Sequence, residues 1–317
     1  HAAERVLAAV QDAYAGLAPG ATRWAGLGSL WLRCGRAVRR AGDALLAAEK
    51  FDAVFLSTTQ FDAFKLGPRW RARFGVPYVL DYQDPWVNDY YDRTGTRPPG
   101  GRLKYAVAQW RARRAEPITL RDAAGIISVS EAYAAMLNRL YPWFDARCVR
   151  VLPFGASESD FAVADRHRPT KPLVPFDDGN VHFVYTGRCG DDMAYSLTVL
   201  FRALRRYRES HPAEAARMRL HFIGTDYSPP PLGRDRALPL AVAERVGDLV
   251  TEHRYRVPYF DALHYLRRAD ALLAVGSDDS SYAASKIFPY LLARRPLLLL
   301  YHESSLVLKL SLIHISK

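Results

Sequence analysis

The chain has 317 residues, 49% of them hydrophobic, so it is long enough for about two domains and too apolar to be disordered. Its net charge of +11 is spread evenly, with 22 basic and 16 acidic side chains in residues 1–160 and 22 and 17 in the remainder. A nucleic-acid-binding protein usually concentrates its charge in one patch or tail, so this spread argues against nucleic acid. It favours anionic small ligands or an anionic membrane surface.

Cysteine and histidine usage argues against a metal or disulfide framework. Cys34, Cys148 and Cys189 are odd in number and far apart, which favours a reducing cytoplasm. No histidine or carboxylate cluster indicates a metal, and no apolar run approaches the roughly 20 residues of a membrane span.

Both ends read as interrupted. The chain begins at His1 rather than at Met, and Ser311–Lys317 (SLIHISK) reads like a sequencing scar, which we exclude from the fold. We therefore expect a fragment that lacks the start of a first domain and the end of a second.

Helix-like and strand-like segments alternate in the first half. Helices are predicted at Ala2–Tyr14, Leu30–Ala48, Gly67–Phe74, Arg102–Glu116 and Ser130–Leu140, the last capped by Ser130. Strands are predicted at Phe51–Ser57, Val76–Leu80, Gly125–Val129 and Arg147–Leu152.

Residues 162–180 are rich in proline and charge and show no periodicity, so we predict a linker there, between a first domain at 1–161 and a second at 181–310. Strands are then predicted at Val181–Thr186, Arg219–Ile223, Val250–Tyr255, Ala271–Val275 and Pro296–Leu300. Helices are predicted at Met193–Ser210, Leu238–Val246, Phe260–Ala269 and Ser285–Ala293. This alternation predicts an α/β fold with parallel sheets, whose ligands bind beyond the carboxyl ends of the strands.

Several short motifs follow one another in a fixed order. They are DYQDPW from Asp81, AEPITLRDAAGIISVSEAYAAML from Ala115, LPFGASESDF from Leu152, YTGRCG from Tyr185, LHFIGT from Leu220, YFDALHYLRRADALLAVG from Tyr259 and SYAASKIFPYLLARRP from Ser281. Together they resemble glycosyltransferase family 4 and its relatives over about residues 50–305. The resemblance implies the GT-B architecture, two Rossmann-like domains facing each other across a cleft. It also implies retention of anomeric configuration and catalysis without a metal.

The loop Gly187–Gly190 follows a strand and precedes a helix, so its glycines allow the backbone to approach a ligand closely. Arg188 offers a forked donor to phosphate oxygens. An ordinary strand-to-helix turn with an exposed arginine is the alternative.

We expect Ser285 to cap the last helix and Lys286 to bind diphosphate, because a cation at a helix start fits poorly unless it shares an anion. A solvated lysine is the alternative. Further candidates for donor binding are Gly224, Thr225, Tyr282 with Ser281 beside it, and Glu303.

The resemblance is imperfect at two positions. The family usually has glutamate, which holds the ribose, where this chain has Pro289, and glycine where it has Arg294. Pro289 is expected in or just past the first helical turn. Glu303 is a weak substitute for the missing carboxylate, and an exposed loop carboxylate is its plainer interpretation.

In the first half, Asp81 and Asp84 follow a predicted strand. We expect Asp81 to be structural and Asp84 to orient or polarise an acceptor hydroxyl, with a turn cap as the alternative. Trp86 is expected to pack rather than to stack on a sugar. The basic helix at Arg102–Arg114 is either a packed crossover or a segment lying on an anionic membrane.

The expected function is transfer of a hexose-type sugar from a nucleoside diphosphate donor to a glycan or lipid-linked acceptor. The expected location is the cytoplasm, with the inner face of the membrane as a second option. Asp84, Arg188 and Lys286 are the expected catalytic residues. The rivals are a GT-B-type sugar-nucleotide epimerase and a non-catalytic nucleotide-sugar-binding protein.

Overall fold

The computed structural model describes residues 30–95, 97–98, 100–277, 285–303, 305 and 307. The chain divides into two compact units, His1–Pro153 and Phe154–Lys317, each described by itself below. The predicted helix Ala2–Tyr14 and the segment 311–317 lie outside the described residues. Within them, no helix is long and apolar enough to cross a bilayer.

The first unit contains a four-stranded parallel sheet in the order β1-β2-β3-β4. Its strands are β1 (Val54–Ser57), β2 (Tyr78–Tyr82), β3 (Gly125–Ser128) and β4 (Val149–Val151). The connections contain η1 (Phe61–Lys65), α3 (Leu66–Phe74), α4 (Tyr90–Thr94), α5 (Arg102–Arg121), α6 (Glu131–Leu140) and η2 (Ala146–Cys148), and α2 (Leu30–Ala48) precedes β1. The Ser130 hydroxyl accepts from the Ala132 N–H at 3.2 Å, which confirms the predicted cap of α6.

Glu116 of α5 is fully buried between β2 and the end of α6. Its carboxylate accepts hydrogen bonds from the hydroxyls of Tyr82 (3.2 Å) and Tyr141 (2.7 Å). Burial raises the pKa of Glu116 to about 7, although these hydrogen bonds oppose the rise. The glutamate therefore links three segments of the first unit through polar contacts inside its core.

The second unit contains a five-stranded parallel sheet in the order β7-β6-β5-β8-β9. The strands are β5 (Val181–Thr186), β6 (Met218–Ile223), β7 (Val250–His253), β8 (Ala271–Val275) and β9 (Leu297–Leu300). The helices are α7 (Glu158–Ala164), η3 (Asp191–Met193), α8 (Ala194–Ser210), α9 (Pro212–Ala215), α10 (Leu238–Ala243), η4 (Gly247–Leu249), α11 (Tyr259–Arg268) and α12 (Ile287–Leu292). Strand order reverses between β5 and β8, the point where open α/β sheets bind ligands.

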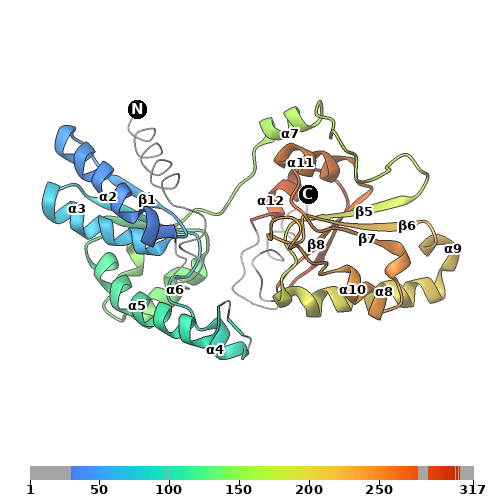
Figure 1. Ribbon diagram of the computed structural model, residues 1–317, viewed down its shortest axis with the longest axis horizontal. Coiled ribbons are helices and arrows are strands. Elements are labelled where there is room, and N and C mark those ends of the chain that lie inside the picture. The colour runs from blue at the N-terminus through green and yellow to red at the C-terminus, as the bar shows by residue number, and fades with distance from the viewer. Residues whose placement is uncertain are drawn as a thin grey trace. The chain divides into compact units, whose positions relative to one another are not determined.

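Helices cover both faces of this second sheet (Figure 1). One apolar cluster joins α7, α11 and α12 to the sheet, and the other joins α8 and α10 to its opposite face. Phe161, Ala164 and Val174 are buried in the first of these clusters, although all three lie in or beside the predicted 162–180 linker. Much of that segment is thus packed onto the second unit, and the division between the units falls earlier, after Pro153.

A pair of buried histidines lies on the sheet face covered by α11. His182 of β5 contacts Asp178 through Nε2 at 2.9 Å and His221 of β6 through Nδ1 at 3.0 Å. A tautomer with His182 donating to Asp178 leaves His221 donating to His182. The Nδ1 atom of His221 is then unprotonated and has no partner among the described residues. Burial, with the neighbouring His182, lowers the pKa of His221 to about 4.

Candidate functional site

The loop after β5 holds Arg188 in a fixed position. Its guanidinium donates two hydrogen bonds to the Asp192 carboxylate, at 2.8 and 3.0 Å. Burial raises the pKa of Asp192, but the paired guanidinium outweighs that effect and keeps the pKa below its ordinary value. With this ion pair in place, about a third of the Arg188 side chain is exposed.

Glycine is required twice in this loop. A Cβ on Gly190 would lie 2.0 Å from an Asp192 oxygen and 2.2 Å from an Arg188 nitrogen, so the ion pair closes over a position without a side chain. Gly187 has a φ of 138°, which side-chain-bearing residues rarely adopt. This geometry shows why the loop itself needs both glycines, and their role in approaching a ligand stays a prediction.

Lys286 reaches the same loop from the start of α12. Its Nζ donates to the Tyr185 hydroxyl at 2.5 Å and lies 4.2 Å from the centre of that ring. The Tyr185 hydroxyl in turn donates to the Arg188 carbonyl. Burial, with Arg188 and Arg256 adding to it, lowers the pKa of Lys286 to about 7. The two predicted cations, far apart in sequence, are thus joined through one tyrosine.

Tyr290 fixes the helix that carries Lys286. Its hydroxyl accepts from the Thr186 N–H at 2.7 Å and donates to the Thr186 carbonyl at 3.1 Å. Tyr290 lies one turn after Lys286 on α12 and is almost completely buried. The end of β5 and the start of α12 are therefore held together next to the loop that carries Arg188.

The prediction that Ser285 caps this helix is wrong. Ser285 is exposed, and α12 begins at Ile287 with Lys286 in the cap position. The reason is Pro289: a helix starting at Lys286 would need a hydrogen bond from the nitrogen of its fourth residue, and proline has no N–H. Pro289 instead occupies the third position, within the first turn as predicted.

Gly224 and Thr225 follow β6, and Thr225 contacts the Gly187–Gly190 loop. The Thr225 carbonyl accepts from the Cys189 N–H at 2.9 Å, and its hydroxyl donates to Glu252 at 2.5 Å. Thr225 is 1% exposed and its hydroxyl is already engaged, so it positions the loop rather than offering a group to a ligand. Burial raises the pKa of the Cys189 thiol to about 12, so this cysteine is not a nucleophile.

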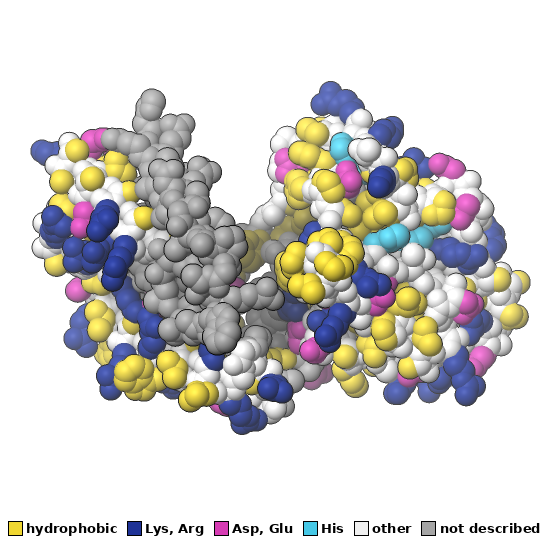
Figure 2. Space-filling model, viewed as in Figure 1, with side chains coloured by type: hydrophobic (Ala, Val, Ile, Leu, Met, Phe, Trp, Pro, Cys, Tyr) yellow, Lys and Arg dark blue, Asp and Glu magenta, His cyan; other side chains and the backbone are white. Residues whose placement is uncertain are grey.

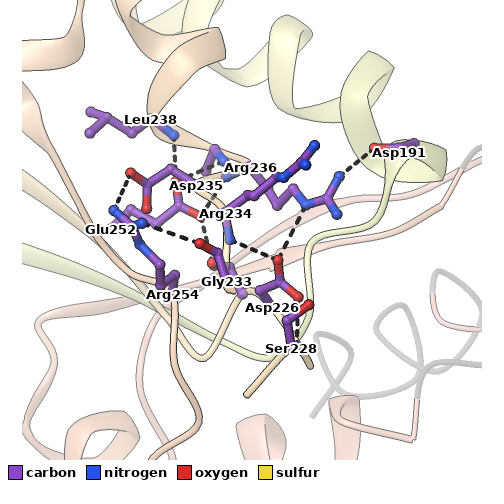
Figure 3. A network of polar contacts seen from close by, with 12 residues as sticks. Asp191, Asp226, Ser228, Gly233, Arg234, Asp235, Arg236, Leu238, Glu252 and Arg254 are labelled. Carbon is purple, nitrogen blue, oxygen red and sulfur yellow. Dashed lines mark hydrogen bonds and ion pairs between the residues drawn. The ribbon is translucent and has the colours of Figure 1, made fainter. Parts of the chain in front are cut away.

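Two carboxylates order the loop after β6 (Figure 3). Glu252 accepts from the backbone N–H groups of Arg236, Ala237 and Leu238 and so caps the start of α10. Asp226 accepts from the N–H groups of Ser228 and Arg234. These hydrogen bonds fix the loop that runs from Gly224 and Thr225 to α10.

Arg256, which the sequence patterns did not single out, is a third cation at this edge. Its side chain packs against Gly224, and its guanidinium lies 4.1 Å from the ring centre of the exposed Tyr227. Among the described residues it makes no ion pair. Its charge adds to that of Arg188 in lowering the pKa of Lys286.

The remaining candidates of the second unit either fall outside the described residues or have no described contact with the three cations. Tyr282 and Ser281 fall among the residues that the structure does not describe. Glu303 is exposed in the turn that follows β9. Arg294 has a φ of 54°, in the left-handed region that favours the glycine usual in the resembling family. Among the described residues, no three His, Cys, Asp or Glu side chains gather as a metal site.

In the first unit, Asp81 and Asp84 differ in burial, and the role of Asp84 stays a prediction. Asp81 is buried and accepts from the Ser57 hydroxyl (2.7 Å) and the Gln83 amide (2.9 Å), whereas Asp84 is exposed in the loop after β2. Trp86 packs parallel to Phe61, with ring centres 5.9 Å apart, which confirms that it packs within the unit.

Comparison with known proteins identifies the relatives of this arrangement. Residues 4–155 match the family described as the glycosyl transferase 4-like domain. A comparison with curated proteins gives no match.

The solved structures similar to this chain share its fold at low sequence identity. One is the N-terminal domain of a Candida albicans trehalose-6-phosphate phosphatase (12% identity, TM-score 0.57, 85% of this chain and 60% of that one). Another is a UDP-forming trehalose-phosphate synthase from Burkholderia xenovorans (14%, 0.53, 92% and 70%). A third is Anabaena HepE in complex with UDP (13%, 0.55, 85% and 64%). This chain therefore spans between 60% and 70% of these three structures. Residues 4–155 belong to the glycosyl transferase 4-like family, in a chain that has the GT-B fold of the glycosyltransferases.

Proposed function

We propose that the protein transfers a hexose-type sugar from a nucleoside diphosphate donor to a glycan or lipid-linked acceptor. One observation carries the proposal: Tyr185 joins Lys286 to the Arg188 loop at the strand-order reversal of the second sheet, with Asp192 paired to Arg188. Arg256 adds a further positive charge beside Gly224, at the end of the neighbouring strand β6. A partly buried cation with a lowered pKa is stabilised by an anionic ligand, and a diphosphate supplies two charges and several acceptor oxygens. HepE has been solved with UDP and with UDP-glucose, which supports a nucleotide-sugar donor here.

The proposed chemistry requires stabilisation of the leaving diphosphate. The bond between the anomeric carbon and the diphosphate oxygen breaks, and its electron pair goes to the diphosphate, where Arg188 and Lys286 neutralise the developing charge. A bond forms from the acceptor oxygen to the same carbon, and the acceptor proton passes to the departing diphosphate oxygen. This route retains configuration and needs no metal.

The first unit is proposed to serve the acceptor. Asp84 is exposed after β2, and its carboxylate can accept a hydrogen bond from an acceptor hydroxyl and orient it. Buried Glu116 contacts Tyr82 before this loop, and also the backbone of Val87 after it, so the loop is held at both ends. The dispersed free cysteines favour a reducing cytoplasm as the setting.

Donor binding is tested by thermal shift of the protein with UDP, GDP, ADP and their sugars. We expect one base to raise the unfolding temperature, and Arg188→Ala and Lys286→Ala each to abolish the rise. Arg268→Ala is the matched control, because it removes an arginine–aspartate pair elsewhere in the same unit. Unchanged donor affinity in both site variants would sink the assignment.

Product analysis separates the two rival functions. Conversion of the donor sugar to its epimer without acceptor would show an epimerase. Donor binding with neither transfer nor hydrolysis would show a binding protein, a reading that the absence of the usual ribose-binding carboxylate at Pro289 favours.

A further inference from the structure

Helix α5 carries an outward-facing row of large apolar side chains. Leu103, Val107, Trp110 and Ile118 are 81%, 48%, 54% and 61% exposed. At 100° per residue these four positions, with Arg114 between them, fall within an arc of about 80° on one side of the helix. The buried residues of α5 begin only at Ala112 and lie on the other side, so this row faces away from the part of the helix that packs in the core.

Basic side chains border the row on both sides. Arg102 and Arg113 flank one side of the arc, and Lys104 and Arg111 flank the other. The single acidic residue of α5, Glu116, is fully buried and adds no exposed negative charge. Within the row itself, the Arg114 guanidinium lies 4.1 Å from the Trp110 ring centre. Figure 2 shows hydrophobic and basic side chains interleaved along this part of the first unit.

A pocket of about 410 Å³ opens beside the row. Arg102 and Arg113 line it together with Trp110, Tyr105 and Asp92. The Asp92 carboxylate accepts from the Tyr105 hydroxyl at 3.2 Å, which engages part of its negative charge. Two guanidinium groups beside an exposed tryptophan are the groups that receive a lipid phosphate at the boundary between headgroups and acyl chains.

We propose that α5 docks the protein on an anionic lipid surface. The apolar row enters the boundary below the headgroups, where tryptophan is favoured, and the flanking cations contact lipid phosphates. A second copy of the chain is a poor occupant, because a two-fold interface would bring the same cations face to face. This proposal is independent of the donor site, whose cations lie in the other unit.

Co-sedimentation of the full chain with vesicles tests the proposal. We expect binding to vesicles of phosphatidylcholine mixed with phosphatidylglycerol, little binding to phosphatidylcholine alone, and weaker binding at high salt. A Leu103→Gln, Trp110→Gln double variant and an Arg102→Gln, Arg113→Gln double variant should each lower the partition coefficient about tenfold or more. All four residues are exposed, so the fold should survive, which circular dichroism can verify.

Two matched controls lie in the second unit. Leu232→Gln with Val242→Gln removes two apolar side chains of 63% and 61% exposure, and Arg166→Gln with Arg206→Gln removes two exposed cations. Both controls should bind vesicles as the unmodified chain does. No vesicle binding, equal binding to neutral vesicles, or equal losses in the controls would each overturn the proposal. So would a dimer in light scattering that the Leu103→Gln, Trp110→Gln variant abolishes, since a second copy would then cover the row.

Discussion

At the scale of single residues, the candidate site depends on a shared tyrosine between two cations. Tyr185 accepts from Lys286 and donates to the Arg188 carbonyl, so it orients both the side chain and the loop. Lys286 thus has a neutral hydrogen-bond partner, and burial is the main cause of its lowered pKa.

The first prediction concerns the pH dependence of donor binding. Free Lys286 loses its proton near pH 7, and a bound diphosphate raises its pKa, so binding takes up a proton above pH 7. Affinity for UDP should therefore fall as pH rises above 7, by up to about tenfold per pH unit. Calorimetry in buffers of different ionisation enthalpy measures both the affinity and the proton uptake. Lys286→Arg stays charged and should lose the dependence. The same slope in that variant would assign the titration elsewhere.

The second prediction concerns Gly190. Gly190→Ala places a Cβ within 2.2 Å of both partners of the Arg188–Asp192 pair, so the pair must separate. We expect donor affinity to drop by about tenfold or more, the equivalent of roughly 1.4 kcal/mol, with the fold retained. Gly155→Ala is the control, because its Cβ would meet nothing within 4 Å. Unaltered affinity in Gly190→Ala would show that the pair is not needed.

The site was only partly accessible from the sequence. Gly187, Arg188 and Lys286 stand in recognisable motifs, and the structure brings them together. The partners that orient them carried no such signal. Tyr185 sits in an apolar strand and looks like a core residue, while its contact with Lys286 spans 101 positions and exists only after folding.

At the scale of elements, strands were the easiest to locate. The predicted limits of β5 at Val181–Thr186 are those of the structure, because an apolar run between two glycines has one plausible extent. Short helices were missed. Helix α7 has only 7 residues, of which Phe161 and Ala164 are buried. Two buried positions are too few to show a helical period, and the prolines that follow indicate a loop.

The third prediction concerns the end of α12. Arg294 adopts a left-handed φ of 54°, which costs a residue with a side chain about 1 kcal/mol. Its contact with Glu158 at 3.6 Å is between exposed groups and adds little. Arg294→Gly should therefore raise the free energy of unfolding of the second unit by roughly 1 kcal/mol, measured by urea titration. Arg295→Gly, at a position without positive φ, should lower it. A loss of stability in Arg294→Gly contradicts the argument.

The fourth prediction concerns the histidine pair on β5 and β6. The folded pKa of His221 is about 4, below the ordinary 6.5, so the unfolded chain binds the extra proton first. The contribution of neutral His221 to the free energy of unfolding is therefore fully present above pH 6.5. It declines as pH falls from 6.5 to 4, by up to about 3 kcal/mol. Urea titrations of the second unit across this range measure the decline, and His221→Leu should reduce it. Exposed His302→Gln should leave it unchanged. A flat profile in the unmodified chain would refute this account.

At the scale of the whole molecule, the chain is two compact units of similar size. All six tryptophans lie in the first unit, between residues 24 and 143, so indole fluorescence reports on that unit alone. Circular dichroism reports on both. This asymmetry allows the stability of each unit to be followed in the intact chain.

The fifth prediction uses this difference. UDP should raise the unfolding temperature seen by circular dichroism for the second unit and leave the tryptophan transition unchanged, because every described cation of the site lies after Pro153. A ligand at 100 times its dissociation constant stabilises by about 2.7 kcal/mol. A shift of the tryptophan transition alone would place the donor in the first unit.

The confinement of the three cations to one unit has an evolutionary consequence. Under the proposed function, a gene that exchanged the segment before Pro153 for that of a relative would keep its choice of nucleotide while acquiring a new recipient for the sugar. The two halves can then diversify at different rates. The second is constrained by the nucleotide sugars that the cell makes, whereas the first can change with the acceptor glycan. Chimeras joined at Pro153 offer a direct route to redirecting such an enzyme.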